Sequence, residues 1–237
     1  MASWDEGLWA SSIESGLPRR DRRSGIYRRY VPDPLIGSPL LLPPDLDELV
    51  ALAEQAVRRL SGDARDLAGI ARFLLRSEAI ASSRIEGIAP AVQQVALAEL
   101  GVRETVPDVS AQARLVANNM TVLHEARTVL VAAPVVTADH VIDLHAALLP
   151  DEPHHHGIRT VQNWIGGSDH HPLDADFVPP APECVPALLD DLIAYLNGGG
   201  HSPIVQAALV HAQFETIHPF TDGNGRVGRA LIHTVLT

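Results

Sequence analysis

The chain is organised around a stretch near its end, His218-Pro219-Phe220-Thr221-Asp222-Gly223-Asn224-Gly225-Arg226-Val227-Gly228-Arg229. Its glycines allow the backbone to turn tightly and to come close to a ligand. The run that follows, VGRALIHTV, predicts a helix, and a helix N-terminus with free N–H groups suits an anion. Arg226 and Arg229 are three residues apart, so on a helix they share a face and can converge on one polyphosphate. The stretch therefore predicts a phosphate-binding site.

Two other residues of the stretch carry chemistry. Asp222 lies at the mouth of the predicted site, where a hard cation that bridges phosphates needs a carboxylate oxygen. His218, four residues upstream, can accept a proton near neutral pH. Together they indicate a reaction on a metal-bound phosphate compound.

Two other interpretations of the stretch are possible from the residues alone. The glycines at 223, 225 and 228 match the dinucleotide fingerprint G-x-G-x-x-G, which needs a preceding strand and an acidic residue about 20 positions later. The preceding segment, Pro203 to Ile217, has helical spacing, and the sequence ends at Thr237. A polar surface turn between two helices is the second alternative, but it needs neither an arginine pair nor a histidine.

The stretch resembles the signature of the Fic family, HPFx[D/E]GNGRxxR, at every specified position. The resemblance implies an enzyme that transfers AMP from ATP to a Tyr, Thr or Ser hydroxyl of a target protein. It implies His218 as the catalytic base and Asp222 as the ligand of Mg²⁺. The implied ATP-binding residues are Asp222, Gly223, Asn224, Gly225, Arg226, Val227, Gly228 and Arg229. A relative with lysine in place of Gly225 works as a kinase, and this sequence has the nucleotidyl-transfer form.

A second motif lies at the end of a helix predicted over about residues 63–87. A glutamate in the last turn of a helix faces the negative end of the dipole, so Glu86 is either solvated or paired with a cation from elsewhere. Ser82-x-x-x-Glu86-Gly87 resembles the inhibitory motif [S/T]xxxE[G/N] of Fic proteins with an N-terminal inhibitory helix. The resemblance implies that Glu86 pairs with Arg229 and keeps ATP from its productive pose.

The non-helical middle of the chain predicts a hairpin. Residues 157–167 are the best strand candidate, and a second extended run lies near 177–180. An ordinary edge hairpin explains the pattern. The family resemblance instead implies a flap over the active site that clamps the target segment by strand addition. The implied nucleotide-facing residues of the flap are Asn163, Trp164, Ile165 and Gly166.

Composition limits the fold and the location. Hydrophobic residues make up 46% and aromatic residues 4%, so the core must consist of aliphatic side chains, which favours helices. We therefore expect a mainly α protein, a Fic-type helical bundle with a small β-hairpin flap. The net charge of −11 argues against nucleic-acid binding. A single cysteine, no transmembrane run and no signal-peptide pattern predict a soluble cytoplasmic protein without membrane contact.

The predicted organisation has two parts. Residues 1–105 hold an N-terminal arm and helices, including the inhibitory helix, and residues 106–237 hold a Fic core. Family members continue with further helices, so the core is expected to be truncated at its C-terminus. Residues 1–44 are read as an arm on the domain surface, with a basic docking tail as the alternative. Adjacent histidines rarely chelate one ion, so a structural metal at residues 154–156 is not favoured.

The predicted function is a Mg-ATP-dependent protein adenylyltransferase, autoinhibited by Glu86. Self-modification and a homodimer are left open. Two alternatives remain: Glu86 orients a water molecule, so that the enzyme removes AMP, or the chain is a non-catalytic ATP-sensing interaction module.

Overall fold

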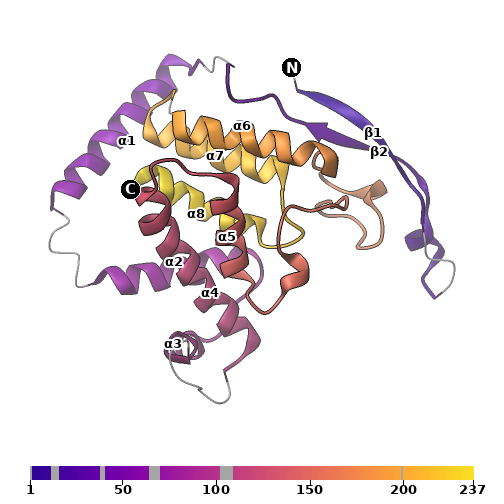
Figure 1. The fold of residues 1–237 in the computed structure, drawn as a ribbon, viewed down its shortest axis with the longest axis horizontal. Coiled ribbons are helices and arrows are strands. Elements are labelled where there is room, and N and C mark those ends of the chain that lie inside the picture. The colour runs from indigo at the N-terminus through magenta and orange to yellow at the C-terminus, as the bar shows by residue number, and fades with distance from the viewer. Residues whose placement is uncertain (1, 12–15, 38–40, 64–69, 102–108, 199) are drawn as a thin grey trace.

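The structure, a computed structural model, describes all residues except 1, 12–15, 38–40, 64–69, 102–108 and 199, and it is mainly helical (Figure 1). The helices are α1 (Pro44–Asp63), α2 (Ala71–Ile85), α3 (Val92–Gly101), α4 (Ala111–Glu125), α5 (Ala138–Leu148), α6 (Val185–Gly198), α7 (Pro203–Ile217) and α8 (Asn224–Leu236). The strands are β1 (Ser3–Trp9) and β2 (Gly25–Val31). The prediction of a mainly α fold is confirmed.

The core lies where α4 to α8 meet, with α2 packed against α4 and α8 (Figure 1). Its buried side chains are almost all aliphatic, as the composition requires, and Phe214 and Phe220 are its two completely buried phenylalanines. Ala79 of α2 and Val95 of α3 belong to the same buried cluster. The N-terminal helices therefore share one core with the helices that carry the signature loop, residues 218–223. The predicted boundary at residue 105 lies outside the described residues.

Helix ends follow the expected capping chemistry. Thr137 caps α5 by accepting a hydrogen bond from the backbone N–H of His140, and the His140 side chain accepts from the Thr137 N–H. Helix α4 continues without a break into Ala126–Leu130, where it widens into a π-helical turn.

The N-terminal arm is a β-hairpin rather than only an extended arm. β1 and β2 pair antiparallel, with Trp4 opposite Tyr30. The hairpin lies along one side of the helices (Figure 1) and contacts the flap segment, residues 157–182. The Tyr30 N–H donates to the Val178 carbonyl at 2.9 Å, and the Trp9 and Trp164 rings meet edge to face at 5.3 Å. The arm therefore covers part of the flap.

The prediction of a regular strand over residues 157–167 is wrong. The flap segment, all of whose residues are described, forms only two isolated antiparallel bridges, Ile165 with Phe177 and Ser168 with His171. Gly166 and Gly167 have φ angles of +72° and +73°, which bend the chain out of the extended conformation. The hairpin path is correct, but glycine geometry shortens its pairing to single bridges.

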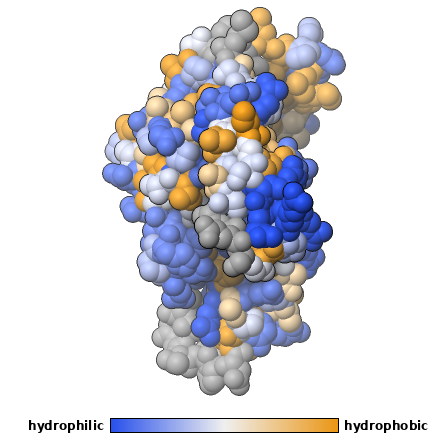
Figure 2. All heavy atoms as spheres, turned by 90° about the vertical axis from the view of Figure 1, so that its right-hand side faces the viewer, coloured by the Kyte–Doolittle hydropathy of each residue, from blue (hydrophilic) through white to orange (hydrophobic). Residues whose placement is uncertain are grey.

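The surface on the hairpin side mixes hydrophilic and hydrophobic residues (Figure 2). No helix in the described part of the chain is long and apolar enough to cross a membrane.

Candidate active site

The signature loop between α7 and α8 is held closed by its own side chains. Phe220 is completely buried. The Asn224 amide oxygen accepts from the Phe220 N–H at 2.9 Å, and its amide nitrogen donates to the Phe220 carbonyl at 2.8 Å. Asn224 was expected among the ATP-binding residues, and in this structure both polar atoms of its buried side chain bind the Phe220 backbone. Asn224 therefore fixes the loop's shape, and the backbone N–H groups at the start of α8 are left to face an anion.

His145 of α5 supports the same loop and was missed as a site residue. Its ring stacks on Phe220 at 3.9 Å, and its Nε2–H donates to the Asp222 carbonyl at 2.9 Å. Burial lowers the pKa of His145 to about 4, so the imidazole is neutral at physiological pH. Its position on a helix resembled that of an ordinary core histidine, and only the fold brings it to the loop.

His218 occupies an unusual backbone conformation at the C-terminal end of α7, with φ 50° and ψ 63°. It is the one described residue other than glycine with a positive φ. Burial, and less strongly the nearby charge of Arg159, lower the pKa of His218, whereas the hydrogen bond to the Glu215 carbonyl acts in the opposite direction. The net lowering keeps the imidazole neutral near pH 7, the state that can accept a proton.

Arg226 lies beneath the loop and is 2% exposed. Its Nη2 lies 3.6 Å from a carboxylate oxygen of Asp222. Its Nε and Nη1 are buried without a hydrogen-bond partner among the described residues. Buried guanidinium donors left unpaired are costly, and an anion such as a phosphate would satisfy them.

Asp222 fits the predicted role of a cation ligand. One oxygen of its carboxylate accepts from the Gly223 N–H at 2.7 Å, and its side chain is 54% exposed. An accessible carboxylate beside a buried arginine offers the hard oxygen that Mg²⁺ prefers, next to donors for the phosphates that Mg²⁺ would neutralise.

The predicted pairing of Glu86 with Arg229 is present. The Arg229 Nη2 donates to Glu86 Oε1 at 2.7 Å and to the Ser82 carbonyl at 3.0 Å, and the Arg229 Nε donates to the Ser82 hydroxyl at 2.8 Å. Glu86 caps the C-terminus of α2, followed by Gly87 at φ +76°. A Cβ atom at Gly225 would clash with the Glu86 carboxylate and the Arg229 guanidinium. The carboxylate therefore lies directly over the first turn of α8.

Two other predicted ATP-binding residues of α8, Val227 and Gly228, pack against neighbouring side chains. Val227 is completely buried in the core. A Cβ atom at Gly228 would clash with the carboxylate of Glu215. Only the backbone of these two residues could face a nucleotide.

Of the four predicted flap residues, one contacts the signature loop and three lie elsewhere. The Asn163 amide donates to the Phe220 carbonyl at 3.0 Å, which ties the flap to the signature loop. Trp164 donates from Nε1 to the Ser168 carbonyl and packs on Trp9 of the arm. Ile165 is 43% exposed, and the Asp176 side chain lies against the α-carbon of Gly166. Of the four, Asn163 is the residue that hydrogen-bonds to the signature loop.

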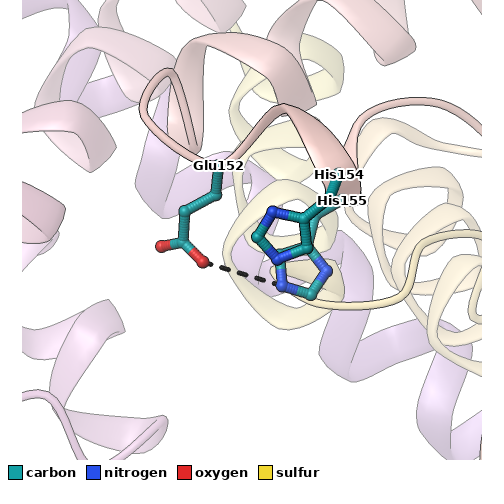
Figure 3. A group of neighbouring side chains, drawn as sticks. All are labelled: Glu152, His154 and His155. Atoms are coloured by element: carbon teal, nitrogen blue, oxygen red, sulfur yellow. Dashed lines mark ion pairs between the residues drawn. The ribbon is translucent and has the colours of Figure 1, made fainter.

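The histidine tract forms a small cluster beside the signature loop. Figure 3 shows Glu152 facing His155, with His154 next to it; the ligand atoms of the three lie within 4.8 Å of one another. His155 also hydrogen-bonds through Nδ1 to the Thr221 hydroxyl at 2.7 Å. Two imidazoles and one carboxylate suit transition metals better than Mg²⁺, so the cluster does not replace Asp222 as the Mg²⁺ candidate. His156 points elsewhere, to the Leu149 carbonyl.

Comparison with known proteins agrees with this geometry. Residues 135–236 match the model of the Fic/DOC family. The chain is 33% identical over 106 residues to protein adenylyltransferase fic-1 of Caenorhabditis elegans, covering 43% of this chain and 19% of the relative. It is 41% identical over 70 residues to a probable protein adenylyltransferase of Aquifex aeolicus, covering 29% of this chain and 22% of the relative. The chain thus spans about a fifth of the length of these curated relatives.

Solved structures match over more of the chain. A Fic family protein from Desulfovibrio desulfuricans superposes with a TM-score of 0.66 at 25% identity, covering 84% of this chain and 59% of the other. Residues 134–508 of Fic-1 from C. elegans give a TM-score of 0.55 at 26% identity, covering 80% of this chain and 58% of that one. A helical bundle with an anion-ready loop between α7 and α8 defines the class, and residues 135–236, which hold this loop, match the Fic/DOC family.

Proposed function

We propose that this protein is a protein adenylyltransferase that transfers AMP from ATP to a hydroxyl side chain of a target protein. The observation that carries the proposal is the pair of buried N–H donors of Arg226 in the first turn of α8 that have no partner among the described residues. The same signature loop holds His218 at the end of α7, where burial lowers its pKa. The curated relatives that match over 106 and 70 residues are named protein adenylyltransferases. Because the chain spans a fifth of their length, the activity is inferred from the site.

Each residue has one task in this reaction. His218 accepts the proton of the attacking target hydroxyl. The backbone N–H groups after Gly223 and the Arg226 guanidinium hold the phosphates, so that charge developing during transfer meets fixed donors. Asp222 would hold Mg²⁺, which supplies charge neutralisation on the phosphates when bound.

Target recognition is assigned to the flap. Its two runs are joined by single bridges only, so backbone donors and acceptors remain that an extended target segment could use by strand addition. Recognition by main-chain bonds tolerates many target sequences, and the target's identity is then set by surfaces outside the flap.

The resting state is inhibited by Glu86. Its carboxylate holds Arg229 and lies over Gly225, where it would repel a phosphate and occupy its space. Release of Glu86 would free the guanidinium for the γ-phosphate and open the first turn of α8.

The experiment is incubation of the parent and the Glu86→Gly variant with Mg-ATP labelled on the α- or the γ-phosphate, followed by intact-mass analysis of the chain and of lysate proteins. We expect an AMP adduct with the α-label only, and more of it in the variant. ATP binding without any adduct in either protein would favour the non-catalytic ATP-sensing module. Loss of AMP from modified proteins in the parent alone would favour the AMP-removing alternative, in which Glu86 orients water.

A further inference from the structure

Arg159 lies between the flap and the signature loop, and neither the motif nor the roles above involve it. It is 2% exposed. Its Nε donates to the His218 carbonyl at 2.8 Å and its Nη1 to the Val161 carbonyl at 3.1 Å. Its Nη2 donates to the carbonyls of Pro180 at 2.7 Å and Ile217 at 3.3 Å. One buried cation thus holds carbonyls from the end of α7, from the signature loop and from the far side of the flap.

The backbone of the same residue adds another contact. The Arg159 N–H donates to the Pro219 carbonyl at 2.9 Å. Three consecutive carbonyls, those of residues 217 to 219, are therefore turned toward one side chain and its own backbone. An arginine can do this because its planar guanidinium carries several donors in a fixed fork, whereas lysine offers one compact point.

The conformation of His218 explains why such a clamp is needed. A residue with a side chain that is held in a sparsely populated backbone region is strained, and this conformation persists only where the surroundings fix it. His218 has this conformation, with φ 50°. Without the guanidinium, the carbonyls of residues 217 and 218 would be buried without these donors. A relaxed backbone at His218 would then carry the imidazole away from its present place.

We propose that Arg159 is a positioning residue that holds His218 in its reactive backbone conformation and ties that conformation to the flap through Pro180. The proposal rests on the proposed function in one respect, the role of His218 as the base. Because Arg159 grips both sides, movement of the flap on target docking would be transmitted to His218 through one rigid side chain.

The electrostatic surroundings of His218 give a readout that a purely structural role would not change. The groups that act on His218 are the Glu215 carbonyl, Arg159, Glu86 and Asp222. Burial and the Arg159 charge lower the pKa of His218, and the other three raise it. Replacing Arg159 with a neutral residue should therefore raise this pKa, whereas lysine should keep it low.

The test uses Arg159→Lys and Arg159→Met in the full chain with Glu86→Gly, so that activity is measurable. Arg23→Lys, at an exposed ion pair with Asp174 on the flap, is the matched control. A misplacement of about 1 Å can cost about 100-fold in rate, so we expect kcat to fall by about 10- to 100-fold in both variants. The KM for ATP should stay within about twofold of the parent, because Arg159 does not reach the phosphate donors. The control should match the parent.

The titration of the His218 ring, followed by NMR with labelled histidine, completes the test and does not depend on catalysis. We expect its pKa to rise in Arg159→Met and to stay near the parent value in Arg159→Lys. An inactive parent would refute the proposed function, while this titration would still decide the placement of His218. An unchanged His218 pKa in Arg159→Met, or a raised KM for ATP with unchanged kcat, would overturn the proposal. Should Arg159→Met fail to fold, the kcat and KM of Arg159→Lys carry the test alone.

Discussion

The signature loop and the contact between α2 and α8 lie side by side, yet they are built differently. The loop depends on groups that are almost fully buried, with Phe220 at 0% and Asn224 at 2% exposure. The contact with α2 centres on one ion pair whose side chains are 17% exposed for Arg229 and 36% exposed for Glu86. The first region is part of the core, and the second is an attachment at its edge.

The difference in burial implies a difference in energy. An ion pair open to solvent is worth about 0–1 kcal/mol, whereas leaving a buried polar group unpaired costs about 1–3 kcal/mol. The signature loop should therefore keep its shape, while the contact of Glu86 with Arg229 can be broken at small cost. If the proposed function is correct, the catalytic loop is rigid and the proposed inhibitory contact is separable from it.

The largest expected effect is a loss of activity on changing the signature loop. His218→Ala should lower the rate of AMP transfer by about 10²- to 10⁴-fold, the usual loss when a general base is removed. ATP binding, measured by calorimetry, should remain, because the donors of Arg226 and the start of α8 are untouched. Transfer above a tenth of the parent rate would contradict the assignment of His218 as base.

The next largest effect is an increase in activity, and it tests the contact between α2 and α8. Glu86→Gly should raise self-modification by about tenfold, which corresponds to about 1.4 kcal/mol. Arg229→Ala also breaks the pair but removes a phosphate ligand, so its activity should stay low. Glu86→Gln is the matched control, because it keeps the bulk over Gly225 and removes the charge. If Glu86→Gly is no more active than the parent by intact mass, Glu86 has no inhibitory role.

A smaller effect is expected at His145, which holds the loop from below. His145→Phe keeps a ring to stack on Phe220 but loses the hydrogen bond to the Asp222 carbonyl. A net hydrogen bond is worth about 0.5–1.5 kcal/mol, so the KM for Mg-ATP should rise by about 2- to 10-fold. The control is His140→Ala on the exposed start of the same helix, which should leave KM unchanged. An unaltered KM in His145→Phe would show that this bond does not set the loop.

The smallest effect concerns stability and pH. Burial raises the pKa of Glu215 to about 7, against about 4.5 in the unfolded chain. Between these values the folded protein holds a proton that the unfolded chain has lost, so stability falls as pH rises through this window. Glu215→Gln removes that dependence. We expect the variant to melt a few degrees above the parent at pH 8 and close to it at pH 5. Equal differences at both pH values, measured by calorimetry, would contradict the raised pKa.

The parts that sequence could predict are the local ones. The helix after the signature followed from the local pattern of glycines and apolar residues. The pairing of Glu86 with Arg229, 143 residues apart, is present and was the exception, because the resemblance of two motifs to a known family implied it. The site residues that were missed depend on contacts across long stretches of chain. His145 meets Asp222 77 residues later, and Arg159 meets His218 59 residues later. A single histidine or arginine carries no local pattern that reveals such a partner.

The same limit applies to two other predictions. Asn224 was predicted to bind ATP, and in the structure both polar atoms of its side chain bind Phe220, a partner that the sequence did not reveal. The run from 157 to 167 has strand-like composition, but Gly166 and Gly167 with φ angles of +72° and +73° limit its pairing to single bridges. The contacts of Arg159 with four carbonyls were likewise not visible in the sequence.

The N-terminal hairpin and the flap lie in contact, and each stabilises the ordered conformation of the other. A two-stranded hairpin alone is marginally stable in water, and this one is attached to the flap by Tyr30, by Trp9, and by the ion pair of Arg23 with Asp174. Each segment thus supplies contacts that offset the conformational entropy lost by the other. The arm and the flap should open and close as one cooperative unit, so amide exchange in the first 31 residues would report on a flap that is more than a hundred residues away in sequence.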